Sequence, residues 1–162
     1  MACDGDIDKR EIKLIKSLHK DYNTFGELDI NNELDKLLLS INRDGHKFLK
    51  EYFEELNSAN LTVPNELKLI EVAIDTIKAD DKIEYSEIKF FKVIRSKLKI
   101  DNQAILDKHP DFEDYLEQDI ISDSYLSRLQ DDFFDTHITS EFDLISKIDD
   151  DLINSLKQEN EE

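Results

Sequence analysis

The chain has 162 residues, which suits one domain or one domain with an appendage. Hydrophobic residues make up 39% of it, whereas glycine (3) and proline (2) are scarce and tryptophan is absent, a composition typical of an all-α protein. The net charge of −18 argues against nucleic-acid binding, which needs Lys and Arg, and the single cysteine excludes both an intrachain disulfide and a cysteine-rich zinc site.

Polar and glycine-containing segments separate the first three predicted helices. The first covers residues 9–22, and Asn31 or Asn32 is expected to cap the second. Residues 43–45 (Arg-Asp-Gly) are expected to end the second helix before the third helix begins. Apolar residues at spacings of three and four mark the inner faces of these helices: Ile12, Ile15 and Leu18; Leu34, Leu37, Leu38 and Ile41; Phe48, Leu49, Tyr52, Phe53 and Leu56.

Three further helices are predicted before the second proline. Pro64 suits the first turn of the fourth helix, because a proline there loses no helical hydrogen bond. The fifth helix covers about residues 85–98. Asp101 or Asn102 is expected to cap a short sixth helix that ends before Pro110.

The acidic residues are concentrated toward the C-terminus. Residues 99–162 hold 19 of the 39 acidic residues but only 5 of the 21 basic ones. We therefore expect a helical domain over residues 1–108 and an acidic C-terminal extension over residues 109–162, which is either an interaction arm or a cap on the helical bundle. The extension is expected to contain an amphipathic helix with Phe142, Ile145, Ile148, Leu152 and Leu156 on its apolar stripe.

One eight-residue pattern occurs twice, at an offset of 76 residues. Residues 4–11 read DGDIDKRE and residues 80–87 read DDKIEYSE. Each copy leads into a predicted helix of the same register. The repetition predicts a duplicated unit with a group of carboxylates at each of two helix starts.

Capping of the two helices is one interpretation of this pattern. Asp8 and Glu11 have the spacing of a capping box, and Glu84 and Glu87 repeat it. The first carboxylate of such a box accepts backbone N–H groups at the helix start, and the second accepts the N–H of the capping residue. Capping alone would account for much of the motif without any ligand.

A divalent-cation site where the two loops meet is the other interpretation. A pseudo-twofold would bring Asp4 and Asp6 near Asp80 and Asp81, and carboxylates that lie close together repel unless a cation separates them. An all-oxygen site favours Ca²⁺, Mg²⁺ or Mn²⁺ over Zn²⁺. The motif is not an EF-hand, because Lys78 would occupy a calcium-ligand position in the second copy.

Residues 79–87 and the predicted helix after them resemble the signature of the TerB-like domains of tellurite-resistance proteins, an Ala-Asp-Gly-x-Ile-x-x-x-Glu loop that often occurs twice. Residues 2–11 resemble the first copy, and the similarity covers about residues 1–108. The resemblance implies an all-α, TerB-like helical bundle with an internal pseudo-repeat, here followed by an acidic C-terminal helical arm. Asp81 replaces the glycine of the signature, and the usual helix before the first motif is absent.

The same resemblance implies an acidic divalent-metal site and a role as an adaptor in stress-response or phage-defence complexes. By motif match, the implied metal residues are Asp4, Asp8, Glu11, Asp80, Glu84 and Glu87. The expected ligand is Ca²⁺, Mg²⁺ or Mn²⁺, and the expected partner is a protein, with a basic protein or a second copy of the chain as candidates. The alternative is an acidic protein-interaction module, in its extreme form a nucleic-acid mimic, with no metal role.

Other functional classes are disfavoured by what the sequence lacks. It contains no nucleophile elbow, phosphate loop or dinucleotide fingerprint, and its four histidines are scattered, so we expect no enzyme. The longest aliphatic run is residues 37–39, and no apolar signal segment is present. A cytoplasmic protein without a membrane span is therefore expected.

Overall fold

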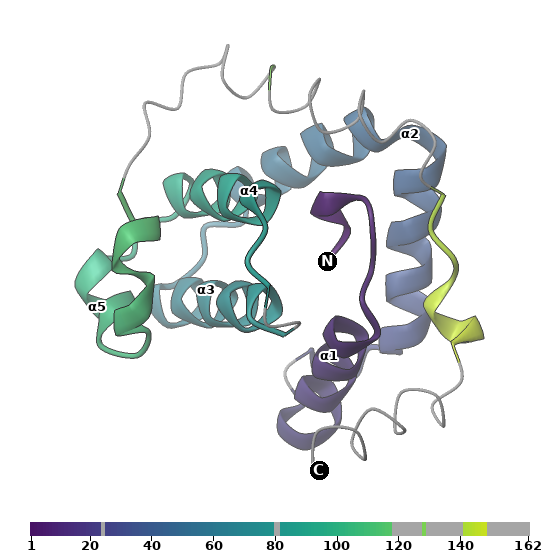
Figure 1. Ribbon diagram of the computed structural model, residues 1–162, viewed down its shortest axis with the longest axis horizontal. Coiled ribbons are helices and arrows are strands. Elements are labelled where there is room, and N and C mark those ends of the chain that lie inside the picture. Colours follow the sequence, from purple (N-terminus) through teal and green to yellow (C-terminus); the bar gives the residue numbers. More distant parts are fainter. Residues whose placement is uncertain (24, 80–81, 118–127, 129–140, 149–162) are drawn as a thin grey trace.

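The computed structural model describes residues 1–23, 25–79, 82–117, 128 and 141–148. Every regular element in these residues is helical, which confirms the predicted all-α class. None of the described helices combines the length and apolarity needed to cross a membrane. The elements, in chain order, are η1 Ala2–Asp4, α1 Lys9–Tyr22, α2 Ile30–Ser58, α3 Val63–Ile77, α4 Tyr85–Ser96, α5 Asn102–Leu106, η2 Pro110–Tyr115 and η3 Ile145–Lys147, where η denotes a short 3₁₀ helix (Figure 1).

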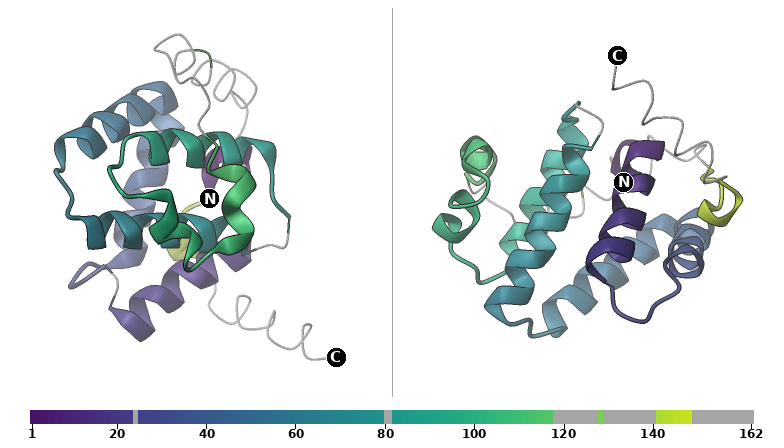
Figure 2. Two further views of the ribbon diagram at one scale, coloured as in Figure 1. Left: turned by 90° about the vertical axis from the view of Figure 1, so that its left-hand side faces the viewer. Right: turned by 90° about the horizontal axis from the view of Figure 1, so that it is seen from below.

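The long helix α2 connects two groups of helices. On one side, α3 and α4 lie side by side, and α5 and η2 pack at their ends (Figures 1 and 2). On the other side, α1 and η3 lie beside the first half of α2, and α1 also contacts α3. The N-terminal element η1 lies between the two groups and contacts α4. The start of the first motif is thereby brought to the helix that follows the second motif.

Element α2 consists of two helical halves that meet at the break predicted for residues 43–45. Asp44 lies there in an extended, non-helical conformation (φ −163°, ψ 86°). Asp44 Oδ1 accepts the backbone N–H of Lys47 at 3.0 Å, so this residue caps the second half of the helix. The predicted interruption is therefore confirmed, and its side-chain cap allows the second half of α2 to begin directly after it.

The other helix ends follow capping chemistry. Helix α1 has the predicted bounds, and α5 begins after Asp101, whose side chain accepts the N–H of Gln103. The cap of α2 is Asp29, which accepts the N–H of Asn32, so the prediction of Asn31 or Asn32 was wrong by two or three residues. Helix α4 ends at Ser96, two residues before the predicted end.

The largest hydrophobic core lies among α3, α4, α5 and η2. Phe91 of α4 and Phe112 of η2 meet edge to face with ring centroids 5.3 Å apart, and both are almost completely buried. Phe112 and Leu116 come from the expected C-terminal extension, yet they belong to this core. The first residues of the extension therefore complete the helical bundle. The buried members are Ile70, Ile74, Ile77, Ile88, Phe91, Leu98, Ile100, Ile105, Phe112 and Leu116.

A smaller cluster joins the two ends of the described chain. Ile145 of η3 is 1% exposed and packs with Ile12 of α1 and Leu38 of α2. Residues 141–148 contain only the single 3₁₀ turn of η3, so the amphipathic helix predicted from Phe142 onward is not formed there. Its other positions, Leu152 and Leu156, lie outside the described residues, as does Asp80 of the second motif.

Candidate functional site

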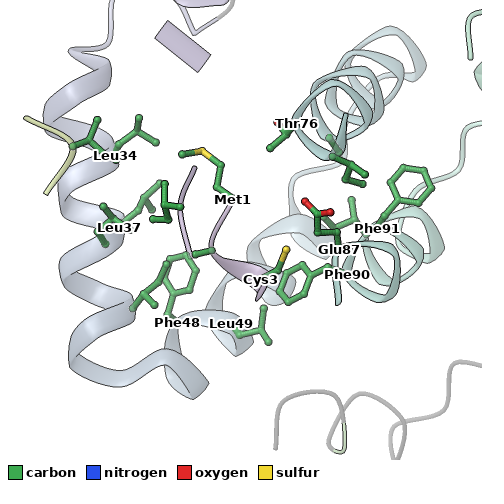
Figure 3. A pocket seen from close by; sticks show the side chains of 18 residues that line it. Met1, Cys3, Leu34, Leu37, Phe48, Leu49, Thr76, Glu87, Phe90 and Phe91 are labelled. Carbon is green, nitrogen blue, oxygen red and sulfur yellow. The ribbon is translucent and has the colours of Figure 1, made fainter. Parts of the chain in front are cut away.

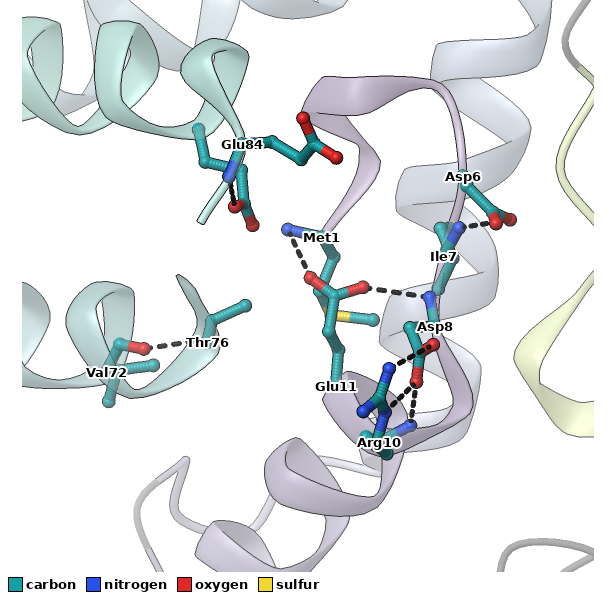
Figure 4. Close-up of polar contacts among 10 residues, drawn as sticks. Met1, Asp6, Ile7, Asp8, Arg10, Glu11, Val72, Thr76 and Glu84 are labelled. Atoms are coloured by element: carbon teal, nitrogen blue, oxygen red, sulfur yellow. Dashed lines mark hydrogen bonds and ion pairs between the residues drawn. The ribbon is translucent and has the colours of Figure 1, made fainter. Parts of the chain in front are cut away.

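The first motif forms the capping box that its spacing predicted. Asp8 stands at the N-cap of α1, and its Oδ1 accepts the backbone N–H of Arg10 at 2.7 Å. Glu11 Oε2 accepts the backbone N–H of Asp8 at 2.9 Å (Figure 4). These bonds satisfy donors that the first turn of a helix would otherwise leave unpaired.

The second motif repeats the bond that fixes the glutamate. Glu84 stands at the N-cap of α4, and Glu87 Oε2 accepts its backbone N–H at 2.9 Å. Glu11 and Glu87 thus have the same local role, three residues after the cap of their own helix. The carboxylate of each is positioned by the backbone of the loop that precedes it.

Each capping carboxylate also pairs with a base of its own motif. Arg10 contacts Asp8 through Nε at 3.0 Å and through Nη2 at 3.2 Å, and the side-chain hydrogen bond from Arg10 holds the pKa of Asp8 below its usual value. Lys82 forms an ion pair with Glu84. The charges of the two capping residues are therefore balanced locally.

Glu11 instead pairs with the N-terminal ammonium of Met1, and the charge of Glu87 contributes to the raised pKa of the same group. Glu11 Oε1 lies 3.3 Å from the Met1 nitrogen, and the charge of Glu87 acts on the same group. Burial by itself lowers the pKa of this ammonium, but the charges of Cys3, Glu11 and Glu87 outweigh it, so that the pKa is raised. Glu11 is 5% exposed and Glu87 is 7% exposed, so both carboxylates lie where an unbalanced charge is costly.

The structure thus separates the six sequence-predicted metal residues into three groups. Glu11 and Glu87 act on the same cation, whereas Asp8 and Glu84 face their own bases. The side chains of Asp4 and Asp80 lie outside the described part of the chain. Among the described side chains, no group of three or more His, Cys, Asp or Glu residues is arranged to hold a metal ion.

An apolar cavity of about 310 Å³ lies beside Glu87. Figure 3 shows the N-terminal residues on one side of it and α2, α3 and α4 around it. Glu87 and Thr76 are the charged and polar side chains in its wall, and Thr76 donates its hydroxyl to the Val72 carbonyl at 2.8 Å. Glu87 is therefore the acidic side chain among the residues that line this cavity, which also include Met1 with its N-terminal ammonium.

Sequence reasoning missed Met1 and the cavity. Met1 belongs to no motif, and its position depends on the packing of η1 against α4. The cavity wall does include residues of the predicted helical stripes, such as Leu38 and Leu49. Their periodicity indicated burial, but periodicity alone does not show how completely facing helices fill the space between them.

A scan against models of protein families found no match to this chain, and searches of curated proteins and of solved structures found none either. The resemblance to the TerB-like domains therefore rests on the two motifs and their spacing.

Proposed function

We propose that this chain is a non-enzymatic, TerB-like adaptor with an internal pseudo-repeat, in which the two motif glutamates hold a divalent cation. The observation that supports the proposal is that Glu11 and Glu87, equivalent residues of the two motifs, are both buried, and that Glu11 already pairs with a cation, the Met1 ammonium, at 3.3 Å. Two buried carboxylates that share a site repel unless a cation balances them. The ammonium of Met1 supplies a single positive charge, and a divalent cation would balance both carboxylates.

The donor atoms suit Ca²⁺, Mg²⁺ or Mn²⁺, because hard cations prefer carboxylate oxygens. Glu11 and Glu87 fit this chemistry directly. Asp8 and Glu84 would have to exchange Arg10 and Lys82 for the metal. Asp4 and Asp80 enter the proposal by motif match alone. As an adaptor in a stress-response or defence complex, the protein would use the cation to stabilise a surface that a protein partner binds.

The alternative is an acidic protein-interaction module without a metal. Capping favours this alternative, because Asp8, Glu11 and Glu87 already accept backbone N–H groups at the starts of their helices. The net charge of −18 would then serve to attract a basic partner. This alternative needs no rearrangement of either ion pair at the helix starts.

Thermal unfolding with and without metal distinguishes the two functions. For an open oxygen site with a Kd on the order of 10⁻⁴ M, ~10 mM Ca²⁺, Mg²⁺ or Mn²⁺ is about 100 times the Kd and stabilises the fold by about 2.7 kcal/mol. The double variant Glu11→Gln, Glu87→Gln should lose this gain. If Glu11 and Glu87 only cap their helices, there should be no metal-dependent gain for the double variant to lose.

The matched control is Glu66→Gln. Glu66 is also buried, at 4% exposure, and it also accepts a backbone N–H, that of Lys99 at 2.9 Å, but it lies outside both motifs. It should lower the melting temperature and leave the metal-dependent gain intact. If no metal changes the melting temperature of the unaltered chain, the acidic interaction module is the better function.

A further inference from the structure

Residues 141–148 lie against α2 in the manner of a bound peptide. Asn42 Nδ2 donates to the carbonyl of Phe142 at 2.9 Å, and the N–H of Phe142 donates to Asn42 Oδ1 at 3.0 Å. One side-chain amide therefore satisfies both backbone groups of a single residue. Asp35 Oδ1 accepts a third backbone group, the N–H of Ser146, at 3.2 Å.

Apolar side chains of the segment complete the contact. Ile145 is the central anchor, with 1% exposure between Ile12 and Leu38. Phe142 and Ile148, three residues to either side, pack against the same cluster and are partly buried. Main-chain hydrogen bonds together with spaced apolar pockets are a common mode of peptide recognition on protein surfaces.

The receiving surface is defined by the sequence of α2. Asp35, Leu38 and Asn42 follow one another at spacings of three and four, so they share one face of the helix. Figure 1 shows residues 141–148, in yellow, along this side of α2. We call the surface formed by Ile12, Asp35, Leu38 and Asn42 the α2 groove.

We propose that the α2 groove is a peptide-binding site, that residues 141–148 occupy it in cis, and that a segment of a partner protein with a Phe-x-x-Ile-x-x-Ile pattern and the same 3₁₀ turn takes their place. The groove contacts three backbone groups, and these are present in any peptide. Sequence enters through the three apolar anchors. A segment that reproduces both features therefore fits the groove whichever chain carries it.

The inference rests on the adaptor part of the proposed function but not on its cation. None of Ile12, Asp35, Leu38 and Asn42 is a predicted metal residue, so the metal titration and the peptide experiment can fail separately. A segment of the same chain competes at a high effective concentration, because its binding is intramolecular. A competing peptide is therefore expected to bind well only after the cis segment is weakened.

The experiment uses the full chain and a fluorescent peptide with the sequence of residues 141–148, followed by anisotropy. The variant Ile145→Asp places a charge among Ile12 and Leu38 and should release the cis segment. The labelled peptide should then bind at least tenfold more tightly than it binds the unaltered chain, since the competent fraction of the groove rises. Ser146→Pro, which removes the N–H given to Asp35 and disfavours the helical conformation of Ile145 before it, should act in the same direction if Ile145→Asp fails to fold.

Asn42→Asp tests the groove itself. It keeps the size of the side chain but removes the donor to the Phe142 carbonyl. Added to Ile145→Asp, it should abolish the gain in peptide binding that Ile145→Asp alone produces. Asn32→Asp on the same helix is the matched control, because Asn32 is exposed and lies outside the groove, and it should leave binding unchanged.

Two results would overturn the proposal. The first is a failure of the peptide-binding experiment. Neither Ile145→Asp nor Ser146→Pro would then bind the peptide more tightly than the unaltered chain, or Asn42→Asp would leave their gain in peptide binding unchanged. The second is that the unaltered chain forms a dimer that Asn42→Asp dissociates, which would assign the groove to a second copy. Retention of the helical circular dichroism spectrum by each variant ensures that binding and folding are separated.

Discussion

Glu11 and Glu87 each accept the backbone N–H of the residue three positions earlier, at 2.9 Å in both cases. The equivalent bonds give the two side chains the same local orientation at the starts of α1 and α4. The contact of η1 with α4 then links the two motifs in space. Capping and cation binding are therefore compatible, since one oxygen of Glu11 caps the helix while the other faces the cation.

Asp8 should make the stability of the protein depend on pH. Its hydrogen bond with Arg10 lowers the pKa of the folded state below the ordinary value of 3.8. A group with a lowered folded pKa stabilises the fold above the unfolded pKa, and that contribution is lost as the pH falls through the folded pKa. We expect Asp8→Asn to reduce the free energy of unfolding near neutral pH and to have a shrinking effect below pH 3.8.

Urea unfolding at a series of pH values measures this difference. Arg10→Gln is the control, because Asp8→Asn made in that background should lose most of its pH-dependent effect. A difference between the unaltered chain and Asp8→Asn that stays constant from about pH 6 to about pH 2 would show that the ion pair does not shift the Asp8 titration.

Asp44 should stabilise the kink of α2 as an internal cap. Asp44→Ala removes the acceptor for the Lys47 N–H and should lower the free energy of unfolding by about 1 kcal/mol. Asp44→Asn keeps an oxygen in the same place and should cost much less. Glu54→Ala, an exposed change in the second half of α2, should remain within about 0.5 kcal/mol. Equal effects of the alanine and asparagine variants at Asp44 would contradict the cap.

Phe112 should be essential to the main core although it follows Pro110. It is fully buried and contacts Phe91 edge to face, so Phe112→Ala should cost about 3–5 kcal/mol. Tyr22→Ala is a suitable control, because Tyr22 is 76% exposed and its loss should change stability by no more than about 0.5 kcal/mol. Denaturant unfolding monitored by circular dichroism measures both.

Truncation after His109 extends the same test. The shortened chain lacks Phe112 and Leu116, which are both buried in the main core, and it should unfold or aggregate. A stable, monomeric fragment of residues 1–109 would mean that residues 110–116 are dispensable. It would then restore the interpretation of the whole extension as an arm.

The sequence predicted well those helix bounds that are set by interactions between residues close together in the chain. The bounds of α1 followed from the capping box at Asp8 and the stripe through Ile12, because both act within a few residues. The break within α2 was predictable, because an Asp-Gly pair is a common helix break. The pair did not show that the Asp44 side chain would itself cap the second half of α2 through the N–H of Lys47.

The candidate site was predictable only in part for a similar reason. Spacing alone indicated that Glu11 and Glu87 would reach back to their caps. Their action on one ammonium depends on the tertiary contact of η1 with α4, to which no motif contributes. Asn42 was missed entirely, because an asparagine on a helix gives no sign that a peptide 100 residues away will bind to it.

The distance in sequence between α2 and its docked segment has a consequence for synthesis on the ribosome. Asn42 and Phe142 are 100 residues apart, so at about 5–20 residues per second roughly 5–20 s pass between their synthesis. During this time Ile12 and Leu38 leave the exit tunnel without the side chain that later covers them. The nascent chain thus presents an uncovered apolar surface early in translation, and a chaperone that binds such surfaces would meet it before Ile145 is made.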